Sequence, residues 1–221
     1  MFALTMTTPR LTNRALLLLC SLCLLAASLS AVDRIGPLDA AGVPAAVKAA
    51  VEERGYRVTL DGVGSADFWF ARAVATSPAS AAGALYPDFA NGQFLAVVTF
   101  PKGTSDFRGQ SVPPGTYTLR YQYIPQDANH MGVSPKPDFL LAVPVAADTT
   151  PADNIPLKRL VALSAKSTGT AHPAVFAMAP AGTPTTVAKD DQGMMIFTAE
   201  LATASGKTEK IAIIVKGQAT Q

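Results

Sequence analysis

Hydrophobic and polar residues alternate along much of the chain beyond residue 55, and this pattern predicts β-strands. The clearest element is GTYTLRYQYI, residues 115–124, in which the odd-numbered side chains from Tyr117 to Tyr123 share one face. The even-numbered side chains from Thr116 to Gln122 are polar and share the other face. A period of two is typical of a strand with one face on the core and one face in water.

Other segments of the same character surround this one. The segment QFLAVVTFP, residues 93–101, is continuously apolar and predicts a central strand that is buried on both faces. The remaining predicted strands are 56–60, 66–73, 138–145, 172–179, 193–204 and 209–217. Seven or eight short strands separated by Gly and Pro turns predict a mainly β protein, a single β-sandwich or a partly open barrel.

Two segments follow a helical period instead, and each predicts a short helix packed on the sheet. The first covers about residues 44–54, with Val43, Val47 and Val51 on one stripe, and Gly55 is expected just past its end. The second covers about residues 155–166, with its apolar stripe on Leu157, Leu160, Val161 and Ser164. Asp153 or Asn154 is expected to cap this second helix.

The first 31 residues have the pattern of a secretory signal peptide. Arg10 and Arg14 precede an apolar run from Ala15 to Ala27, and the small residues SLSA follow. The run is shorter than the roughly 20 apolar residues that span a bilayer. We therefore expect cleavage after Ala31, export to the periplasm or the medium, and a mature single domain of residues 32–221 without a membrane span.

Cleavage changes the cysteine content and the charge of the protein. Cys20 and Cys23 both lie in the predicted signal peptide, so the mature chain has no cysteine. A cysteine nucleophile, an iron–sulfur cluster and a thiolate zinc site are thereby excluded. Two of the 18 basic residues also leave, and 18 − 2 = 16 balance the 16 acidic ones. A chain with no net charge and no basic block has no electrostatic motive to bind nucleic acid.

One segment resembles a known kind of domain. The sequence FRGQSVPPGTYTLRYQYIP, residues 107–125, contains a Pro-Gly turn followed by an alternating strand. It resembles the PAGTY segment of secreted bacterial β-sandwich domains, including the carboxypeptidase-regulatory-like, or prealbumin-like, modules. The resemblance supports the β fold class, and it assigns no activity and no catalytic residue to this chain.

The candidate site residues gather around the two histidines. His130 lies in the segment QDANHMGVSPKPDF with Asp127, Asn129 and Asp138, and His172 precedes a predicted strand. Two imidazoles and one or two carboxylates can bind zinc or copper, so His130, His172 and Asp127 or Asp138 form a possible metal or hydrolase site. The alternative is that each histidine closes a loop through backbone hydrogen bonds, with Asp127 and Asn129 forming side-chain turns.

Other constellations that carry chemistry are absent from the sequence. The segment SGKT at 205–208 lacks the glycine of a phosphate-binding loop, because Leu201 occupies that position, and no G-x-S-x-G motif occurs. The aromatic residues around Trp69 and Tyr121 predict either a core cluster or a platform for sugar rings.

We therefore expect no catalytic residue and no cofactor, and a non-catalytic binding or accessory module. Its partner is a small molecule, a glycan or a protein. The His-based metal protein or hydrolase is the first alternative, and a structural component of the cell envelope is the second.

Overall fold

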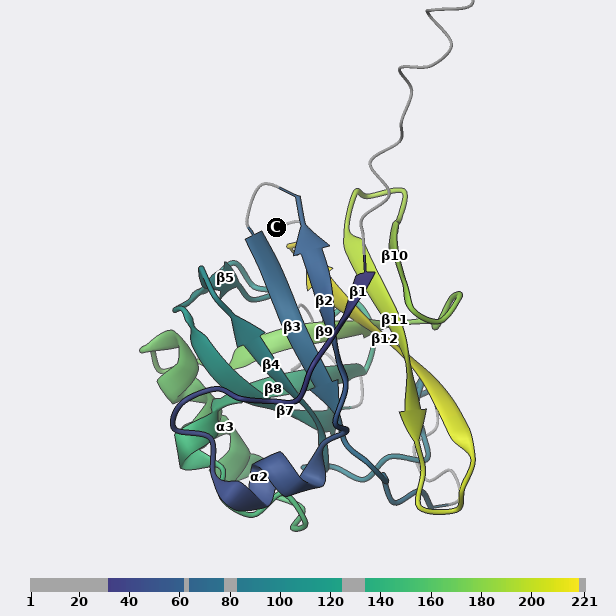
Figure 1. Cartoon of the computed structure of the whole chain (residues 1–221). Helices are drawn as coiled ribbons and strands as arrows, with labels where there is room; N and C mark the ends of the chain where they lie inside the picture. The colour runs from purple at the N-terminus through teal and green to yellow at the C-terminus, as the bar shows by residue number, and fades with distance from the viewer. Residues whose placement is uncertain (1–31, 62–63, 78–82, 125–133, 219–221) are drawn as a thin grey trace, which may run out of the picture.

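The computed structural model describes residues 32–61, 64–77, 83–124 and 134–218. In this part of the chain the protein is mainly β with two α-helices, which confirms the predicted class. Ten strands form one antiparallel sheet that curves into a nearly closed barrel, and two short strands form a separate hairpin (Figure 1). The strands therefore belong to a single continuous sheet, so the barrel alternative describes them better than two packed layers.

The order of the strands in the sheet is β1-β2-β3-β4-β7-β8-β9-β12-β11-β10. The sheet consists of β1 (Val32–Ile35), β2 (Gly55–Leu60), β3 (Gly64–Phe70), β4 (Phe94–Phe100), β7 (Gly115–Tyr123), β8 (Asp138–Pro144), β9 (Ala174–Ala179), β10 (Thr186–Lys189), β11 (Met195–Ala202) and β12 (Thr208–Lys216). The hairpin pairs β5 (Thr104–Ser105) with β6 (Ser111–Val112). All eight predicted strands are present, and β1, β5, β6 and β10 are the additional ones.

The main core fills the interior of the barrel. Phe68 and Phe70 of β3 point inward and pack on Phe197 of β11, with ring centroids 5.3 and 6.2 Å away. Tyr117, Leu119 and Tyr121 of β7 also belong to this core, as their shared face predicted. Aromatic residues from distant strands thus hold the two halves of the sheet together.

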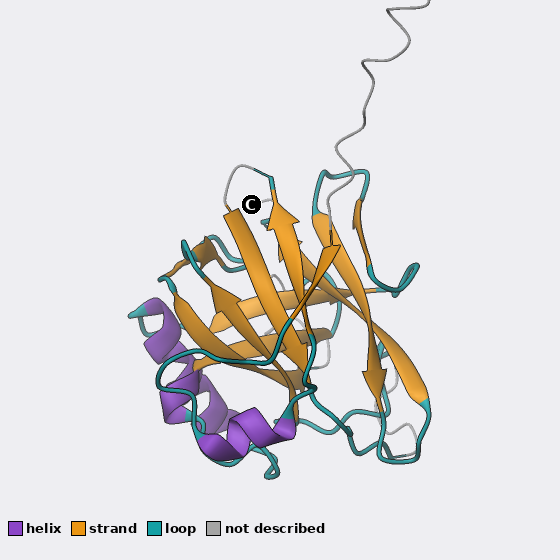
Figure 2. Cartoon of the chain, in the orientation of Figure 1, coloured by secondary structure: helices purple, strands orange, loops and turns teal. Residues whose placement is uncertain are grey.

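The outer face of the sheet is covered where β8 and β9 lie. Helix α3 (Leu157–Thr168) packs there, and Leu160 joins a second apolar cluster with residues of β8 and β9. Ser164 donates a hydrogen bond of 2.7 Å from its hydroxyl to the Ala142 carbonyl. Figure 2 shows this helix on the outside of the strands, and its cover explains why β8 and β9 read as apolar runs rather than alternating ones.

The two helices differ from the prediction at their ends. Helix α2 (Ala45–Ala50) is much shorter than residues 44–54, because Val51 is extended and bridges Ala71 next to β3. Gly55 consequently begins β2 instead of ending a helix. In α3 the N-cap is Pro156 without a side-chain hydrogen bond, and Leu157 is exposed rather than part of the buried stripe.

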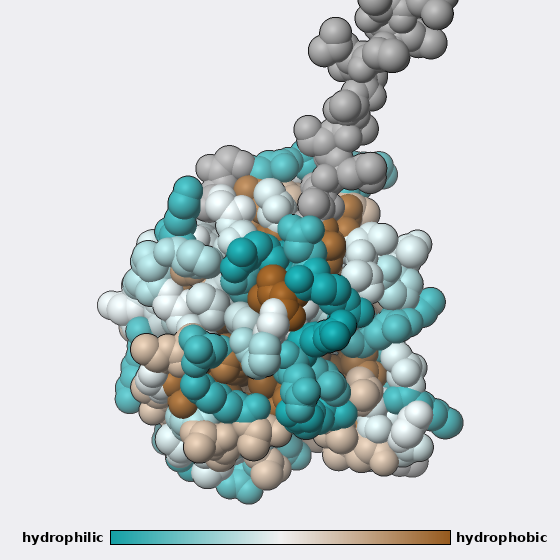
Figure 3. All heavy atoms as spheres, viewed as in Figure 1, coloured by the Kyte–Doolittle hydropathy of each residue, from teal (hydrophilic) through white to brown (hydrophobic). Residues whose placement is uncertain are grey.

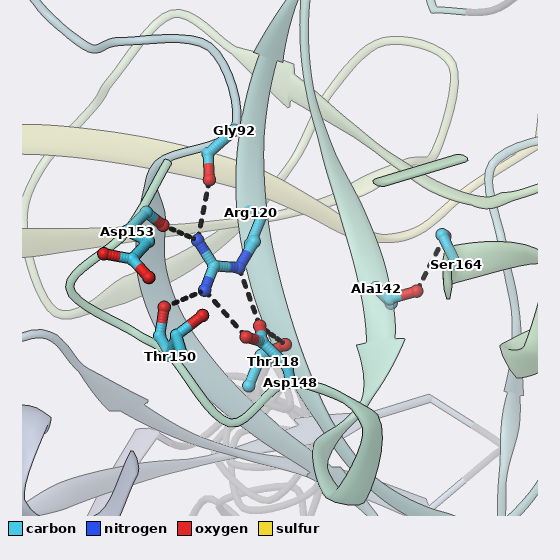
Figure 4. A network of polar contacts seen from close by, with 8 residues as sticks. All are labelled: Gly92, Thr118, Arg120, Ala142, Asp148, Thr150, Asp153 and Ser164. Carbon is cyan, nitrogen blue, oxygen red and sulfur yellow. Dashed lines mark hydrogen bonds and ion pairs between the residues drawn. The ribbon is translucent and has the colours of Figure 1, made fainter. Parts of the chain in front are cut away.

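A buried ion pair holds the segment after β8 against β7 (Figure 4). The side chains of Arg120 and Asp148 are at most 1% exposed. The Arg120 Nε and Nη2 each donate a hydrogen bond of 2.7 Å to the Asp148 carboxylate. The other guanidinium N–H groups donate to the carbonyls of Gly92, Thr150 and Asp153 at 2.6–2.9 Å. All five donors of the guanidinium therefore have an acceptor. The polar face predicted for this strand is thus buried under the chain instead of solvated.

Candidate binding cleft

The predicted histidine site lies partly outside the described residues. Asp127, Asn129 and His130 fall in the segment 125–133, about which the structure makes no statement. Asp138 and His172 are described, and they lie at opposite ends of neighbouring strands. Because Phe139 pairs with Ala177 and Ala142 with Ala174, the two residues are roughly 20 Å apart along the ladder. The structure does not bring these two together.

Asp138 is fully buried and binds the chain segment that precedes β4. Its carboxylate accepts hydrogen bonds from the backbone N–H of Leu85 at 2.7 Å and of Tyr86 at 3.0 Å. It also accepts one of 2.7 Å from the Tyr121 hydroxyl. Three donors satisfy this carboxylate, so its role among the described residues is to anchor the 85–86 segment over the end of the barrel.

Tyr86 extends this cluster into the sheet. Its hydroxyl donates a hydrogen bond of 2.6 Å to the Ala179 carbonyl of β9 and accepts one of 2.9 Å from the Ala212 N–H of β12. Ala179 and Ala212 are partners in the ladder, so the hydroxyl bridges the two strands. Burial raises the pKa of Tyr86 to about 12, and burial together with the Asp138 hydrogen bond raises the pKa of Tyr121. Both phenols are therefore structural hydrogen-bonding groups in their neutral form.

His172 is exposed and closes a turn with its backbone. Its backbone N–H donates a hydrogen bond of 3.0 Å to the Thr170 hydroxyl, and its backbone carbonyl accepts one of 2.8 Å from the Thr168 hydroxyl. This is the loop-closing arrangement that the alternative interpretation predicted for it. Within the described ranges, no three His, Cys, Asp or Glu side chains gather closely enough to hold a metal ion.

The aromatic residues belong to the core rather than to a sugar platform. Trp69 is 6% exposed, and its indole N–H donates 2.9 Å to the Gly36 carbonyl. Tyr56, Tyr117 and Tyr121 are buried as well. Among the described residues Leu157 is the one large hydrophobic side chain that is exposed.

A cleft that the sequence did not predict lies where the sheet fails to close. It has a volume of about 620 Å³. It lies between β1 and β2 on one side and the C-terminal half of β11 on the other. Its lining residues come from five parts of the chain: Arg34, Glu52, Glu53, Arg54, Tyr56, Phe70, Ala71, Arg72, Glu200, Ala202 and Thr208. A volume of this size is ordinary for a ligand-binding cleft. We call it the seam cleft.

Charges of both signs line the seam cleft above an aromatic floor. The Arg34 guanidinium lies 4.0 Å over the ring of Tyr56, a cation–π contact that fixes one wall. Arg72 lies 3.7 Å from Glu53, in an exposed ion pair. Glu52, Arg54 and Glu200 form no ion pair with any described residue, so their charges are free to meet a ligand. In Figure 3 hydrophilic residues gather over the middle of this face, where β1 and β2 lie.

A second, larger hollow adjoins the seam cleft. Its volume is about 960 Å³, and it lies between α2, residues 71–77 and residues 149–154. Alanine and threonine side chains make up most of its lining, and Arg72 is shared with the seam cleft. Few of its groups are charged, so it offers less to orient a ligand than the seam cleft does.

Sequence reasoning missed the seam cleft because its residues are far apart in the chain. Glu52 and Glu53 fall within the helix predicted for about residues 44–54, whereas they lie in the link between α2 and β2. The signal that points to this is Gly55, which ends the helical pattern directly before an alternating strand. Nothing in the local sequence places Glu200 of the β11–β12 hairpin opposite Arg34.

Comparisons with protein-family models, curated proteins and solved structures found no match to this chain. In the described part of the chain, no helix has both the length and the apolar character needed to cross a membrane.

Proposed function

We propose that this chain is an exported, non-catalytic binding or accessory module and that its ligand occupies the seam cleft. The signal-peptide pattern of residues 1–31 supports the location in the periplasm or the medium. The observation that carries the proposal is the seam cleft itself, where Glu52, Arg54 and Glu200, which form no ion pair with any described residue, surround a concave site at the open edge of the barrel.

The arrangement of the charges favours binding over catalysis. Among the described residues, the lining of the cleft contains arginines and glutamates but no histidine, and the rings of Tyr56 and Phe70 are buried beneath it. Arginine binds carboxylates and phosphates through a planar fork of donors, and glutamate accepts from ammonium and amide groups. A ligand with both kinds of group fits these walls.

A thermal-shift screen of residues 32–221 against amino acids, peptides, dicarboxylates, nucleotides and oligosaccharides tests the proposal. A ligand present at 100 times its dissociation constant stabilises the fold by about 2.7 kcal/mol. In a domain of this size that raises the melting temperature by roughly 5–10 °C. The variant Arg54→Glu should lose this shift, because a cleft cation becomes an anion.

The matched control is Arg159→Glu on α3, which makes the same charge change at an exposed position outside the cleft. It should keep the full shift. A shift that survives in Arg54→Glu, or the absence of a shift with every compound class, would contradict the proposed function.

A further inference from the structure

The register of the strands shows which backbone groups face the seam cleft. In an antiparallel sheet both backbone groups of a residue point to the same neighbouring strand, and successive residues point to opposite sides. The N–H of Ala71, directly after β3, donates 2.9 Å to the Leu95 carbonyl of β4. Because Trp69 pairs with Val97 and Asp67 with Thr99 in the same register, Asp67 and Trp69 also face β4.

The same alternation continues to the edge of the sheet. If Asp67 faces β4, then Phe68 faces β2 and its partner Tyr56 faces β3. Arg57 then faces β1 and pairs with Asp33, which leaves Arg34 pointing away from β2. The N–H and C=O of Arg34 therefore lie on the free edge of β1, and Arg34 lines the seam cleft.

The opposite wall shows the same situation at Glu200. The Thr198 carbonyl accepts from Thr185 N–H at 2.8 Å, and the Ala202 carbonyl accepts from Val74 N–H at 2.9 Å. Thr198 and Ala202 thus face away from β12, and Glu200, midway between them, faces the same way. Strand β10 ends its pairing at Thr198, so the backbone of Glu200 has no partner among the described residues.

We infer that the ligand of the seam cleft is an extended peptide segment, which adds as a strand between β1 and β11. This inference rests on the proposed function and names the class of its ligand. In this gap, successive residues of the added strand would form backbone hydrogen bonds alternately with Arg34 of β1 and with Glu200 of β11. The added strand would thereby close the barrel. Sheet edges with unpaired N–H and C=O groups are recognised by peptides in this way.

The charges that line the gap add selectivity to this backbone pairing. Arg34 and Arg54 attract acidic side chains of the segment, and Glu52 and Glu200 attract basic ones. The occupant is therefore a segment of mixed charge, whose side chains alternate between the aromatic floor and the solvent.

The test begins with a phage-displayed library of random linear dodecapeptides, selected on immobilised protein of residues 32–221. The affinity of a selected synthetic peptide is then measured by fluorescence anisotropy for four variants. Arg34→Pro and Glu200→Pro remove the N–H groups that face the cleft, and proline is tolerated at an edge position whose N–H is not used in the sheet. Arg34→Ala and Glu200→Ala remove the same side chains but keep the backbone donors.

We expect both proline variants to bind at least tenfold more weakly than the matching alanine variants. Hydrogen exchange of the unmodified protein provides a second readout that does not depend on folding of a variant. The Arg34 and Glu200 amides should exchange quickly in the free protein and become protected when the peptide is added.

Two outcomes would overturn the inference. If proline and alanine variants bind equally, or the two amides stay unprotected, then the peptide is not held as a strand. If no peptide is selected while the thermal-shift screen finds another ligand that needs Arg54, then the peptide class is wrong and the proposed function stands.

Discussion

The wall of the barrel at β7 and its seam at β1 and β11 use the same residue types in opposite ways. On β7, Arg120 is fully buried, and every donor of its guanidinium has an acceptor. At the seam, Arg54 and Glu200 are exposed and have no partner among the described residues. A satisfied buried charge contributes to the unique packing of a fold, and an unsatisfied exposed one is available for recognition. We therefore expect substitutions at Arg120 to act on stability and substitutions at the seam to act on the proposed binding.

The largest expected effect comes from breaking the buried pair. Arg120→Ala leaves the Asp148 carboxylate buried without its cation, so we expect the free energy of unfolding to fall by about 3–5 kcal/mol in chemical denaturation. Arg57→Ala is the control, because Arg57 binds Asp67 in the same two-bond geometry but is half exposed. Its loss should be smaller than that of Arg120→Ala, because removal of the half-exposed arginine opens the Asp67 carboxylate, which is buried in the folded protein, to water. Equal losses in the two variants would remove the distinction between a structural and a surface arginine.

The second largest effect is expected at Gly92, whose carbonyl accepts from Arg120. A methyl group at Gly92 would come within 2.0 Å of the Ile155 carbonyl oxygen, and the residue has a φ of +78°. The left-handed backbone and the overpacking together should cost about 2–5 kcal/mol in Gly92→Ala. Gly42→Ala isolates the backbone part, because Gly42 has a φ of +75° with nothing within 4 Å of the added carbon. A similar melting temperature for both variants would show that residues 92 and 155 are not in contact.

A smaller, pH-dependent effect is expected at Tyr86. Tyr86→Phe removes a hydroxyl that bridges β9 and β12 and should cost about 1–3 kcal/mol. Because the pKa of Tyr86 is raised from 10.0 to about 12, the neutral phenol stabilises the fold fully below about pH 10. This contribution is lost as the pH rises from about 10 to 12. Denaturation between pH 8 and pH 12 should therefore be less pH-dependent in Tyr86→Phe than in the unmodified protein.

The control for the lost hydrogen bonds is Tyr117→Phe, which loses a single hydrogen bond to the Pro113 carbonyl. Burial raises the pKa of Tyr117 as well, so the two variants are compared at neutral pH. Tyr117→Phe should cost about 0.5–1.5 kcal/mol. A Tyr86→Phe variant with an unchanged alkaline profile would contradict the assignment of a buried, bridging phenol.

The smallest effects are expected at the seam. Glu52→Ala and Arg54→Ala remove exposed charges without ion-pair partners among the described residues, so the free energy of unfolding should change by no more than about 0.5 kcal/mol. The same variants should weaken ligand binding. If either one destabilises the fold by 2 kcal/mol or more, measured by denaturation, the seam residue belongs to the structural part of the barrel.

The comparison also shows what the sequence can reveal. The strand from Gly115 to Tyr123 was predictable with its two faces, because alternation is a local property. That Arg120 is buried was not predictable, because its cover comes from residues 145–155, which have no periodic pattern of their own. The predicted C-terminal end of α2 was wrong for a similar reason. Val51 continues the apolar stripe of the helix, but its bridge to Ala71 is a tertiary contact that the local sequence does not reveal.

The seam cleft is the extreme case of this limit. Its charged residues come from β1, the link before β2, the segment after β3, and β11, and each is unremarkable in its own surroundings. Only the path of the sheet brings Arg34 and Glu200 to facing edges. The histidine hypothesis required the loop of His130 and the loop of His172 to meet, and the two of its members that the structure describes, Asp138 and His172, lie at opposite ends of β8 and β9.

The Tyr86 hydroxyl has a further consequence for the time that the barrel stays folded. Its two contacts join residues that are 93 and 126 positions apart in the chain. Closing such long loops costs entropy that is recovered only after β9 and β12 are in place, so we expect these bonds to form late in folding. Interactions made that late slow unfolding without changing the rate of folding. We therefore expect Tyr86→Phe to unfold faster than the unmodified protein while folding at the same rate, which shortens the lifetime of the native state.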